Sequence, residues 1–255
     1  MKKIILALLI ACNCMAQPQI TWQKYFYTST GNNVMNYIVE MEDSGFVTGT
    51  VMPQFNPSCR IIRTDKSGDT LWVKKENWGG NMYKAPTYGY ICSGYKSYGQ
   101  LVRLSFNFDT IWVKDYLQSP GFDIATCNDG GFLLITHNFV SKTDSLGNIL
   151  WSKNIGGSTY NALSCKNGDI LVMGKFSNGP DQYFAKLYDS TGTLLWNRTY
   201  GNWYISWSQS SFGGILDAVE LPDGNFMAAC IAQWGITNAG GDWDLMKIER
   251  FTGDT

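Results

Sequence analysis

The chain has 255 residues, of which 44% are hydrophobic and 15% aromatic, with 27 glycines, only 16% charged residues and a formal net charge of −1. This length suffices for one large domain with a sizeable core. A balanced charge argues against binding to nucleic acid or to an anionic membrane surface, because both interactions depend on clustered positive charge.

Residues 1–16 predict a secretory signal peptide. Lys2 and Lys3 precede an apolar run over residues 4–11, and Ala16 offers a cleavage site. The run is too short to cross a membrane, which takes about 20 apolar residues. We therefore expect export to the periplasm, the outer surface or the extracellular space. A lipid anchor at Cys12, in a sequence resembling the bacterial lipobox, is the less favoured alternative, since it would leave almost no polar tether before the first strand.

The mature chain, residues 17–255, repeats a Trp followed two residues later by a base. The five pairs are Trp22/Lys24, Trp72/Lys74, Trp112/Lys114, Trp151/Lys153 and Trp196/Arg198. Midway between them stand Gly-containing turns before apolar runs, as in "NDGGFLLITH" from Asn128. Short apolar runs bounded by such turns are typical of hairpins. Each unit of about 40 residues therefore predicts four antiparallel strands, A to D.

Four-stranded units with this period predict an all-β fold, a β-propeller whose blades surround a central axis. A β-solenoid or sandwich array is the alternative. We expect about five blades. The fifth unit ends at "IERFTGDT", ahead of a D strand, whereas the segment 20–27 has the pattern of a D strand without a C strand. That segment would complete the last blade in a closed ring of five; the interpretation we favour is a fragment of a larger ring.

The repeats resemble those of secreted β-propeller proteins of the Bacteroidota. "FAKLYDSTGTLLWNRTYGN" and "CNDGGFLLITH" show the pattern, which is an apolar strand with Lys, an Asp-Ser-x-Gly turn, Leu-Trp, a base, and then Asp-Gly-Gly before an aromatic residue. The resemblance extends over residues 20–255. It implies a propeller fold and a place at the cell surface.

No catalytic, cofactor or metal motif stands out. The GxSxG, HExxH, P-loop and dinucleotide-binding patterns are absent from the sequence. One histidine, His137, cannot form a His-based zinc site and is expected to be a hydrogen-bonded structural residue. Five cysteines remain outside the signal segment, without CxxC spacing, and are expected to be small buried hydrophobic residues: Cys59, Cys92, Cys127, Cys165 and Cys230. We thus expect no cofactor, no bound metal and no catalytic residue.

One polar column runs through the repeats. Nine positions before the first residue after each A–B turn stand Asn81, Asp123, Asn161 and Asp217, with Tyr37 at this place in the first unit. On the innermost strand of a blade these residues would line the central channel and offer oxygen atoms to a cation or a polar ligand. The alternative is that such side chains cap local turns.

Three tryptophans are not explained by the repeat. Trp203, Trp207 and Trp234 lie with Tyr204 and Asn238 in two insertions of the fifth unit. Aromatic rings and polar side chains on loops suit sugar or peptide recognition, although long loops also bury tryptophans against their own scaffold. We interpret the protein as an exported, non-catalytic module that binds a glycan or a protein. The alternatives are a carbohydrate-active lyase or hydrolase with acidic residues at the channel mouth, and a structural spacer.

Overall fold

The structure is a computed structural model, and it describes residues 23–25, 34–52, 58–76, 80–85, 87–95, 98–116, 122–176, 183–200, 214–233 and 241–255. Within these ranges the chain forms strands and turns and no helix. The predicted signal peptide, residues 1–16, lies outside them.

Five antiparallel sheets, called blades here, follow one another in chain order. Blade 1 contains β1 (Val34–Glu40), β2 (Phe46–Met52), β3 (Ser58–Thr64) and β4 (Thr70–Glu76); blade 2 contains β5 (Met82–Lys84), β6 (Tyr90–Tyr95), β7 (Gly99–Leu104) and β8 (Thr110–Tyr116); blade 3 contains β9 (Asp123–Thr126), β10 (Phe132–Ile135), β11 (Phe139–Thr143) and β12 (Ile149–Asn154); blade 4 contains β13 (Ser158–Ser164), β14 (Ile170–Lys175), β15 (Tyr183–Tyr188) and β16 (Leu194–Tyr200); blade 5 contains β17 (Gly214–Glu220), β18 (Phe226–Gln233) and β19 (Gly241–Ile248). The predicted units of strands A to D are confirmed, and blade 5 has strands A to C.

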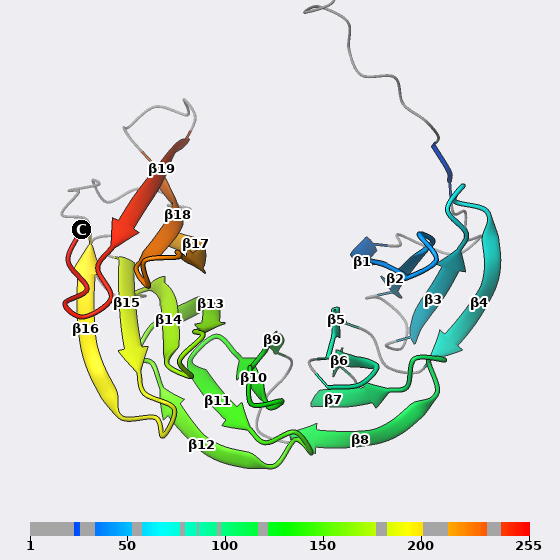
Figure 1. Cartoon of the computed structure of the whole chain (residues 1–255), viewed down its shortest axis with the longest axis horizontal. Helices are drawn as coiled ribbons and strands as arrows, with labels where there is room; N and C mark the ends of the chain where they lie inside the picture. The colour runs from blue at the N-terminus through cyan, green and yellow to red at the C-terminus, as the bar shows by residue number, and fades with distance from the viewer. Residues whose placement is uncertain are drawn as a thin grey trace, which may run out of the picture.

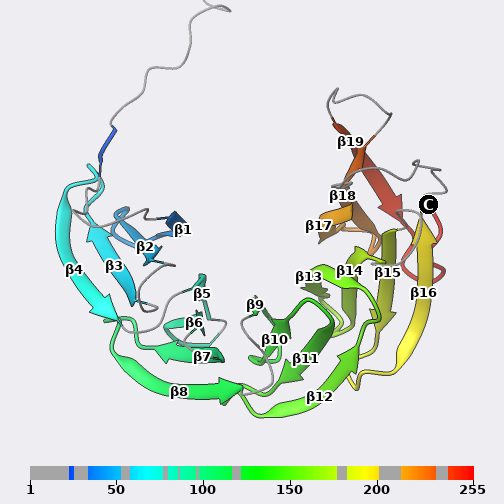
Figure 2. The same cartoon turned by 180° about the vertical axis from the view of Figure 1, so that it is seen from behind.

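The blades are arranged around one axis, with β1, β5, β9, β13 and β17 on the inner side (Figure 1). The D strands β4, β8, β12 and β16 lie along the outer side, as the reverse view also shows (Figure 2). The described blades form an open arc with blade 1 and blade 5 at its ends. Most of the segment 20–27 lies outside the described residues, so its part in completing a blade stays a prediction.

The hydrophobic core lies between neighbouring blades. Between blades 4 and 5, for example, Leu171 and Met173 belong to the same buried cluster as Ile215 and Phe226. Similar clusters join the other three pairs of neighbours. Since burial of one such side chain contributes roughly 1.5–3 kcal/mol, contact between blades is the main source of stability.

Four of the five cysteines contribute to this core. The thiols of Cys92, Cys127, Cys165 and Cys230 are buried and form no disulfide, which confirms the prediction for these residues. Burial raises the pKa of Cys127 to about 11 and that of Cys165 to about 12. Both therefore stay protonated at neutral pH and act as small apolar side chains. The side chain of Cys59 lies outside the described part of the chain.

The repeated Trp joins each blade to the C–D turn of the next. The indole Nε1 of Trp151 donates a hydrogen bond to the carbonyl oxygen of Ser190 at 3.1 Å, and that of Trp196 donates to Arg250 at 2.6 Å. The base two positions later reaches the same turn, because alternate residues of a strand share one side. Arg198 Nε lies 3.3 Å from Asp254 Oδ1. The repeated motif is thus a structural joint.

One residue of the C–D turn has a left-handed backbone conformation. Gly192, with φ of 83°, lies so close to Trp151 that a Cβ atom there would be 2.9 Å from the indole. Glycine allows both the dihedral angle and the contact. In blade 2 the position is Phe108, with φ of 63°, whose ring stacks on Tyr90 at 4.7 Å and meets Trp72 edge-on at 5.3 Å. In blade 2, the aromatic contacts of Phe108 thus take the place of the close approach that Gly192 makes to Trp151.

A second repeated contact ties strand C to the A–B turn within a blade. A base of strand C binds an Asp of the turn in three pairs, Arg63–Asp43, Lys142–Asp129 and Lys247–Asp223. In blade 2 the base is Arg103, but Thr87 stands in place of the Asp, and its Oγ1 accepts a hydrogen bond of 3.3 Å from Arg103 Nη2. Arg103 is only 6% exposed, and its Nη1 has no hydrogen-bond partner within the described ranges. Burial lowers the pKa of this guanidinium.

Replacing Thr87 with Asp is expected to raise the free energy of unfolding at pH 7 by about 1 kcal/mol, because a charged partner would satisfy the buried guanidinium of Arg103. Urea denaturation of both proteins measures the difference. Thr87→Asn is the matched control, since Asn has nearly the same shape as Asp and no charge.

The gain in stability from Thr87→Asp should be larger at neutral pH than in acid. In the equivalent pair, hydrogen bonds from Lys142 and the backbone outweigh burial and lower the pKa of Asp129. A carboxyl whose pKa is lowered by folding stabilises the fold above its unfolded value of about 3.9 and loses that effect as pH falls through the folded value. The advantage of Thr87→Asp should therefore disappear at acidic pH. An equal gain from Thr87→Asn, or a gain that persists in acid, would contradict the proposed charge pairing.

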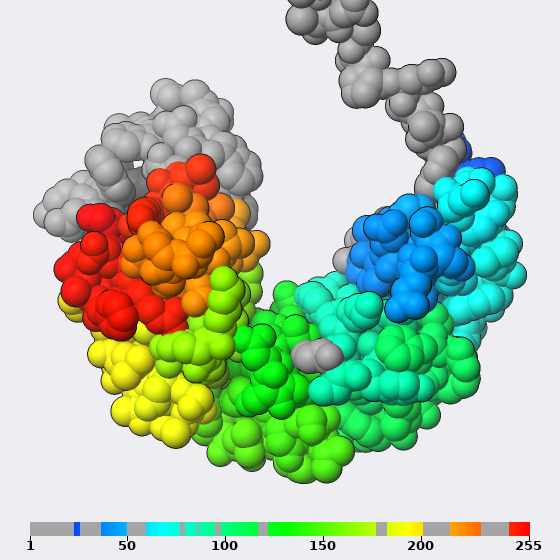
Figure 3. Space-filling view, viewed as in Figure 1, coloured from blue at the N-terminus to red at the C-terminus, as the bar shows by residue number. Residues whose placement is uncertain are grey.

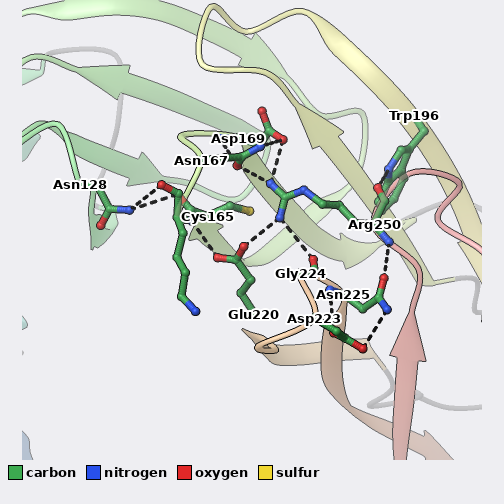
Figure 4. A network of polar contacts seen from close by, with 11 residues as sticks. Asn128, Cys165, Asn167, Asp169, Trp196, Glu220, Asp223, Gly224, Asn225 and Arg250 are labelled. Carbon is green, nitrogen blue, oxygen red and sulfur yellow. Dashed lines mark hydrogen bonds and ion pairs between the residues drawn. The ribbon is translucent and has the colours of Figure 1, made fainter.

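Blade 4 lacks this base, and the next blade supplies one. Leu187 occupies the position of the base, and Asn167 that of the acid. Arg250 reaches in from the turn after β19 (Figure 4). Its Nη2 donates hydrogen bonds to Asn167 and, at 2.9 Å, to Asp169 Oδ2, while its Nη1 donates to Glu220 Oε1 at 2.9 Å. This buried network joins blade 4 to blade 5.

Candidate binding face

The two faces of the arc differ in their connections. Each blade is an up-and-down meander, so its A–B and C–D turns lie at one end of the strands and its B–C and D–A connections at the other. The A–B turns (41–45, 85–89, 127–131, 165–169 and 221–225) all have the same length. The D–A connections, in contrast, range from the short 155–157 to the long 201–213. We call these the turn face and the variable face.

The predicted polar column lies on the inner strands, at their beginning in blades 2 and 3 and in their middle in blades 4 and 5. β9 begins at Asp123, and Asn81 directly precedes β5. Bulges in β13 and β17 come just before Asn161 and Asp217. The structure joins the four residues in two pairs: Asn81 Nδ2 donates a hydrogen bond of 3.2 Å to Asp123 Oδ1, and Asn161 Nδ2 one of 2.8 Å to Asp217 Oδ1. Each pair connects neighbouring blades.

The same side chains also bind the backbone of their own strands. Asp123 Oδ1 accepts the backbone N–H of Ile124 at 2.8 Å, and Asp217 Oδ1 accepts that of Ala218 at 2.8 Å. Bonding to the local backbone, as in the alternative interpretation of the column, therefore occurs together with the pairing between blades, although Asp217 lies within a strand and not at a turn. Asp123 and Asp217 remain exposed and can offer oxygen atoms to a ligand. Ligand binding by the column stays a prediction.

Tyr83 is a member of this group that the repeat alignment missed. Its hydroxyl donates a hydrogen bond of 2.6 Å to Asp123 Oδ1. Burial, and then this hydrogen bond to a carboxylate, raise the pKa of Tyr83 above its usual value. Its position two residues after Asn81 was the available signal, since alternate residues of a strand share one side. The group on blades 2 and 3 thus presents a carboxylate held by an amide and a phenol.

His137 contributes a further link between blades on this face. Its Nε2 lies 3.0 Å from Ser158 Oγ, and its carbonyl oxygen accepts the N–H of Thr159 at 2.7 Å. Both contacts connect the B–C connection of blade 3 to the beginning of β13. His137 therefore has the hydrogen bonds expected of a structural residue.

The aromatic candidates Trp203, Tyr204, Trp207, Trp234 and Asn238 lie outside the described residues. Their positions along the chain place them in the D–A connection between β16 and β17 and in the B–C connection between β18 and β19. The strand ends that flank both connections lie at the variable face.

Comparison with known proteins supports the architecture. No family model matches the chain, and no curated protein does. A Bacteroides caccae protein of unknown function is similar in structure, with a TM-score of 0.56 and 13% identity over 92% of this chain and 84% of that one. The Dos1 propeller matches with a TM-score of 0.54 and 16% identity over 83% of this chain and 52% of that one. BBS1N in complex with ARL6DN matches with a TM-score of 0.54 and 13% identity, over 91% of this chain and 71% of that one.

The fold is a β-propeller. Identities this low show the fold alone. The chain spans about half the length of the Dos1 chain that it matches. Within the described residues, this propeller has no helix that is long and apolar enough to cross a membrane. In the same part of the chain, no group of three or more His, Cys, Asp or Glu side chains is placed to hold a metal ion.

Replacing Asn161 with Asp should destabilise the propeller by about 1 kcal/mol at pH 7. The change would remove the amide donor and place a second carboxylate against Asp217, and two adjacent carboxylates raise each other's pKa. A pKa raised by folding costs stability above the unfolded value, so the loss should diminish as pH falls through the raised value and should be absent below about 4. Thermal unfolding at pH 7 and pH 3.5 measures both effects.

Asn197→Asp is the control, because Asn197 is exposed on β16 of the same blade. It should change stability little at either pH. If Asn161→Asp were equally harmless, Asn161 and Asp217 would not be in contact in solution.

Proposed function

We propose that this propeller is an exported, non-catalytic binding module that recognises its ligand with the variable face. The observation that carries the proposal is the difference between the two faces. Turns of constant length cover one face, whereas connections of different length and composition cover the other. Binding residues concentrate on variable loops held by a rigid scaffold, and the joints between blades make this scaffold rigid.

A carbohydrate is the ligand class that we favour. The inner strands, which begin at the variable face, carry the exposed carboxylates Asp123 and Asp217, and the sequence adds Trp203 and Trp207 in the longest connection. Flat aromatic surfaces beside polar side chains match the alternating apolar faces and hydroxyl groups of sugars. A protein ligand is the second candidate, supported by a neighbour of the same fold, BBS1N, whose structure is a complex with ARL6DN.

An enzyme that uses acidic residues at the channel mouth remains the rival function. A glycosidase needs two carboxyl groups on either side of the bond that it cleaves. Asp123 and Asp217 belong to blades 3 and 5, which are not neighbours, and each already accepts two or more hydrogen bonds through Oδ1. This arrangement favours binding over hydrolysis. A purely structural spacer is the third alternative.

A glycan array probed with fluorescently labelled protein tests the proposal. We expect binding to a restricted set of oligosaccharides, and a loss of at least tenfold in Trp203→Ala and Trp207→Ala. Phe251→Ala is the matched control, because Phe251 is an exposed aromatic residue on the turn face of the same blade, and it should bind as the wild type does. Release of reducing sugar from the bound glycans would show an enzyme. Loss of binding in Phe251→Ala alone would contradict the assignment to the variable face.

Export is part of the proposal and rests on residues 1–16. The N-terminal sequence of the protein recovered outside the cytoplasm tests it. Cleavage after Ala16 predicts a first residue of Gln17, whereas a lipid-modified Cys12 would indicate the anchored alternative. Recovery of the uncleaved chain in the cytoplasm alone would contradict export.

A further inference from the structure

Blade 2 departs from the repeat at three positions of the turn face. In its A–B turn, Thr87 stands where blades 1, 3 and 5 have Asp and blade 4 has Asn, and Tyr88 stands where the other blades have Ser or Gly. In its C–D turn, Phe106 stands where blades 1, 3 and 4 have Lys or Ser. Figure 3 shows blade 2 packed between blades 1 and 3 along the arc, so these differences do not arise at an end of it.

The first difference leaves a buried cation without an anion. Arg63 Nη2 binds the carboxylate of Asp43 in blade 1, and Lys142 Nζ lies 2.8 Å from Asp129 Oδ2 in blade 3. Arg103 is buried as deeply as these two bases, but its contact with the A–B turn is the 3.3 Å hydrogen bond to the hydroxyl of Thr87. Because an unpaired buried charge is costly, an anion beside Arg103 would bind favourably.

The place of the missing carboxylate is open to solvent. The side chains of Asp43 and Asp129 are 61% and 59% exposed, whereas the bases that they bind are 8% and 4% exposed. In both blades the carboxylate thus covers the base from the solvent side of the turn. Thr87 is exposed in the same way. A carboxylate from solution can therefore approach Arg103 Nη2 as Asp43 approaches Arg63 Nη2.

Two exposed aromatic rings adjoin this place. Tyr88 directly follows Thr87, and its ring meets that of Phe106 edge-on at 4.6 Å. Phe106 also contacts the buried ring of Tyr90 at 6.2 Å. Since these contacts hold the rings in position, an apolar group that packs against them would order few side chains on binding.

The backbone of the turn is also different in blade 2. The fourth residue of the A–B turn is a glycine with left-handed backbone in blades 3, 4 and 5, whereas in blade 2 the left-handed residue is the fifth one, Gly89, with φ of 62°. Tyr88 can thus occupy the fourth position without a left-handed conformation. The neighbouring turn of blade 3 lies close by, because a Cβ atom on Gly130 would be 3.3 Å from Thr87 Cγ2.

We propose that the two turns of blade 2 bind a small organic acid whose carboxylate is attached to an aromatic ring. The carboxylate takes the place of the missing Asp and binds the guanidinium of Arg103, which suits planar carboxylates, while the ring packs against Tyr88 and Phe106. One cation and two rings suit a small molecule, because a stable protein interface needs about 800 Å² on each partner. This site is separate from the ligand site proposed for the variable face and takes a different ligand.

Isothermal titration calorimetry of the whole chain with phenylacetate, at constant ionic strength, tests the site. We expect saturable binding of one molecule per chain. Phenylacetamide is the matched control ligand, because it has the same ring and no charge, and it should bind more weakly by roughly tenfold or more. Absence of saturable phenylacetate binding, or equal binding of phenylacetamide, would overturn the proposal.

Variants of the turns locate the binding. Thr87→Asp should weaken phenylacetate binding by roughly tenfold or more, because its own carboxylate would occupy the site, while Thr87→Asn keeps most of the affinity. Phe106→Ser, which introduces the residue found in blades 3 and 4, should weaken it by roughly fivefold. Phe251→Ala, at an exposed aromatic residue of the turn face of blade 5, should leave it unchanged. Circular dichroism confirms that each variant is folded. Undiminished binding by folded Thr87→Asp would show that the acid binds elsewhere and would overturn the assignment.

Discussion

Replacing Arg250 with Met is expected to lower the free energy of unfolding by about 3–5 kcal/mol, the typical cost of removing one partner from a buried ion pair. Asp169 and Glu220 would be left as carboxylates in a largely buried site without their cation. Met keeps the apolar stem of Arg, so the loss should reflect charge and hydrogen bonding more than volume. Urea denaturation at pH 7 measures the change.

Lys247→Met is the matched control for Arg250. It removes a base of the same blade, but from a pair in which both side chains are about half exposed, and such pairs contribute little to stability. Acid should also rescue Arg250→Met in part, because protonation removes the unpaired charges. A loss as small as that of Lys247→Met would show that Arg250 does not join blades 4 and 5 in solution.

Replacing Trp196 with Ala should cost about 3–5 kcal/mol, the usual cost of truncating a buried aromatic side chain. Trp196 is only 7% exposed, packs in the core between blades 4 and 5 and donates a hydrogen bond to Arg250. Thermal and urea unfolding of the purified variant measure the loss. The indole is thus expected to be the most important single side chain of its joint.

The same repeat position in blade 1 supplies the comparison. Trp72 is 36% exposed, so Trp72→Ala should cost about half as much, since less apolar area leaves water when it packs. Equal losses for Trp196 and Trp72 would mean that the joints do not differ as the structure shows. A larger loss for Trp72 would contradict the account of the joint outright.

The fold was predictable because the repeat contains residues that mark where its strands end. The Asp-Ser-x-Gly turn around Gly192 marks the end of a strand. The Trp two residues before a base marks the side of the strand that meets the next blade. The structure confirms both. The number of strands in each unit followed from the spacing of these signals. Stacking around an axis followed because a four-stranded unit with two apolar faces must bury both.

The contacts between blades were less accessible to sequence reasoning. The absence of a base at Leu187 is visible in the repeat, but nothing local indicates that Arg250 compensates for it, because the two positions meet only through the stacking of blades. The column with Asn161 and Asp217 was recognisable from its spacing. Its pairing could not be read from the spacing, because it depends on how neighbouring blades stack, and Tyr83 was missed because it belongs to one blade alone. The aromatic candidates beginning at Trp203 stay predictions.

The central claim is that the variable face binds the ligand and the turn face does not. Amide hydrogen exchange, with and without the glycan selected by the array, tests it most directly, since exchange slows where a ligand covers the backbone. The account predicts protection in the connections 201–213 and 234–240 and around Asp123, with the turns 65–69 and 189–193 unchanged. Protection confined to those turns would contradict it.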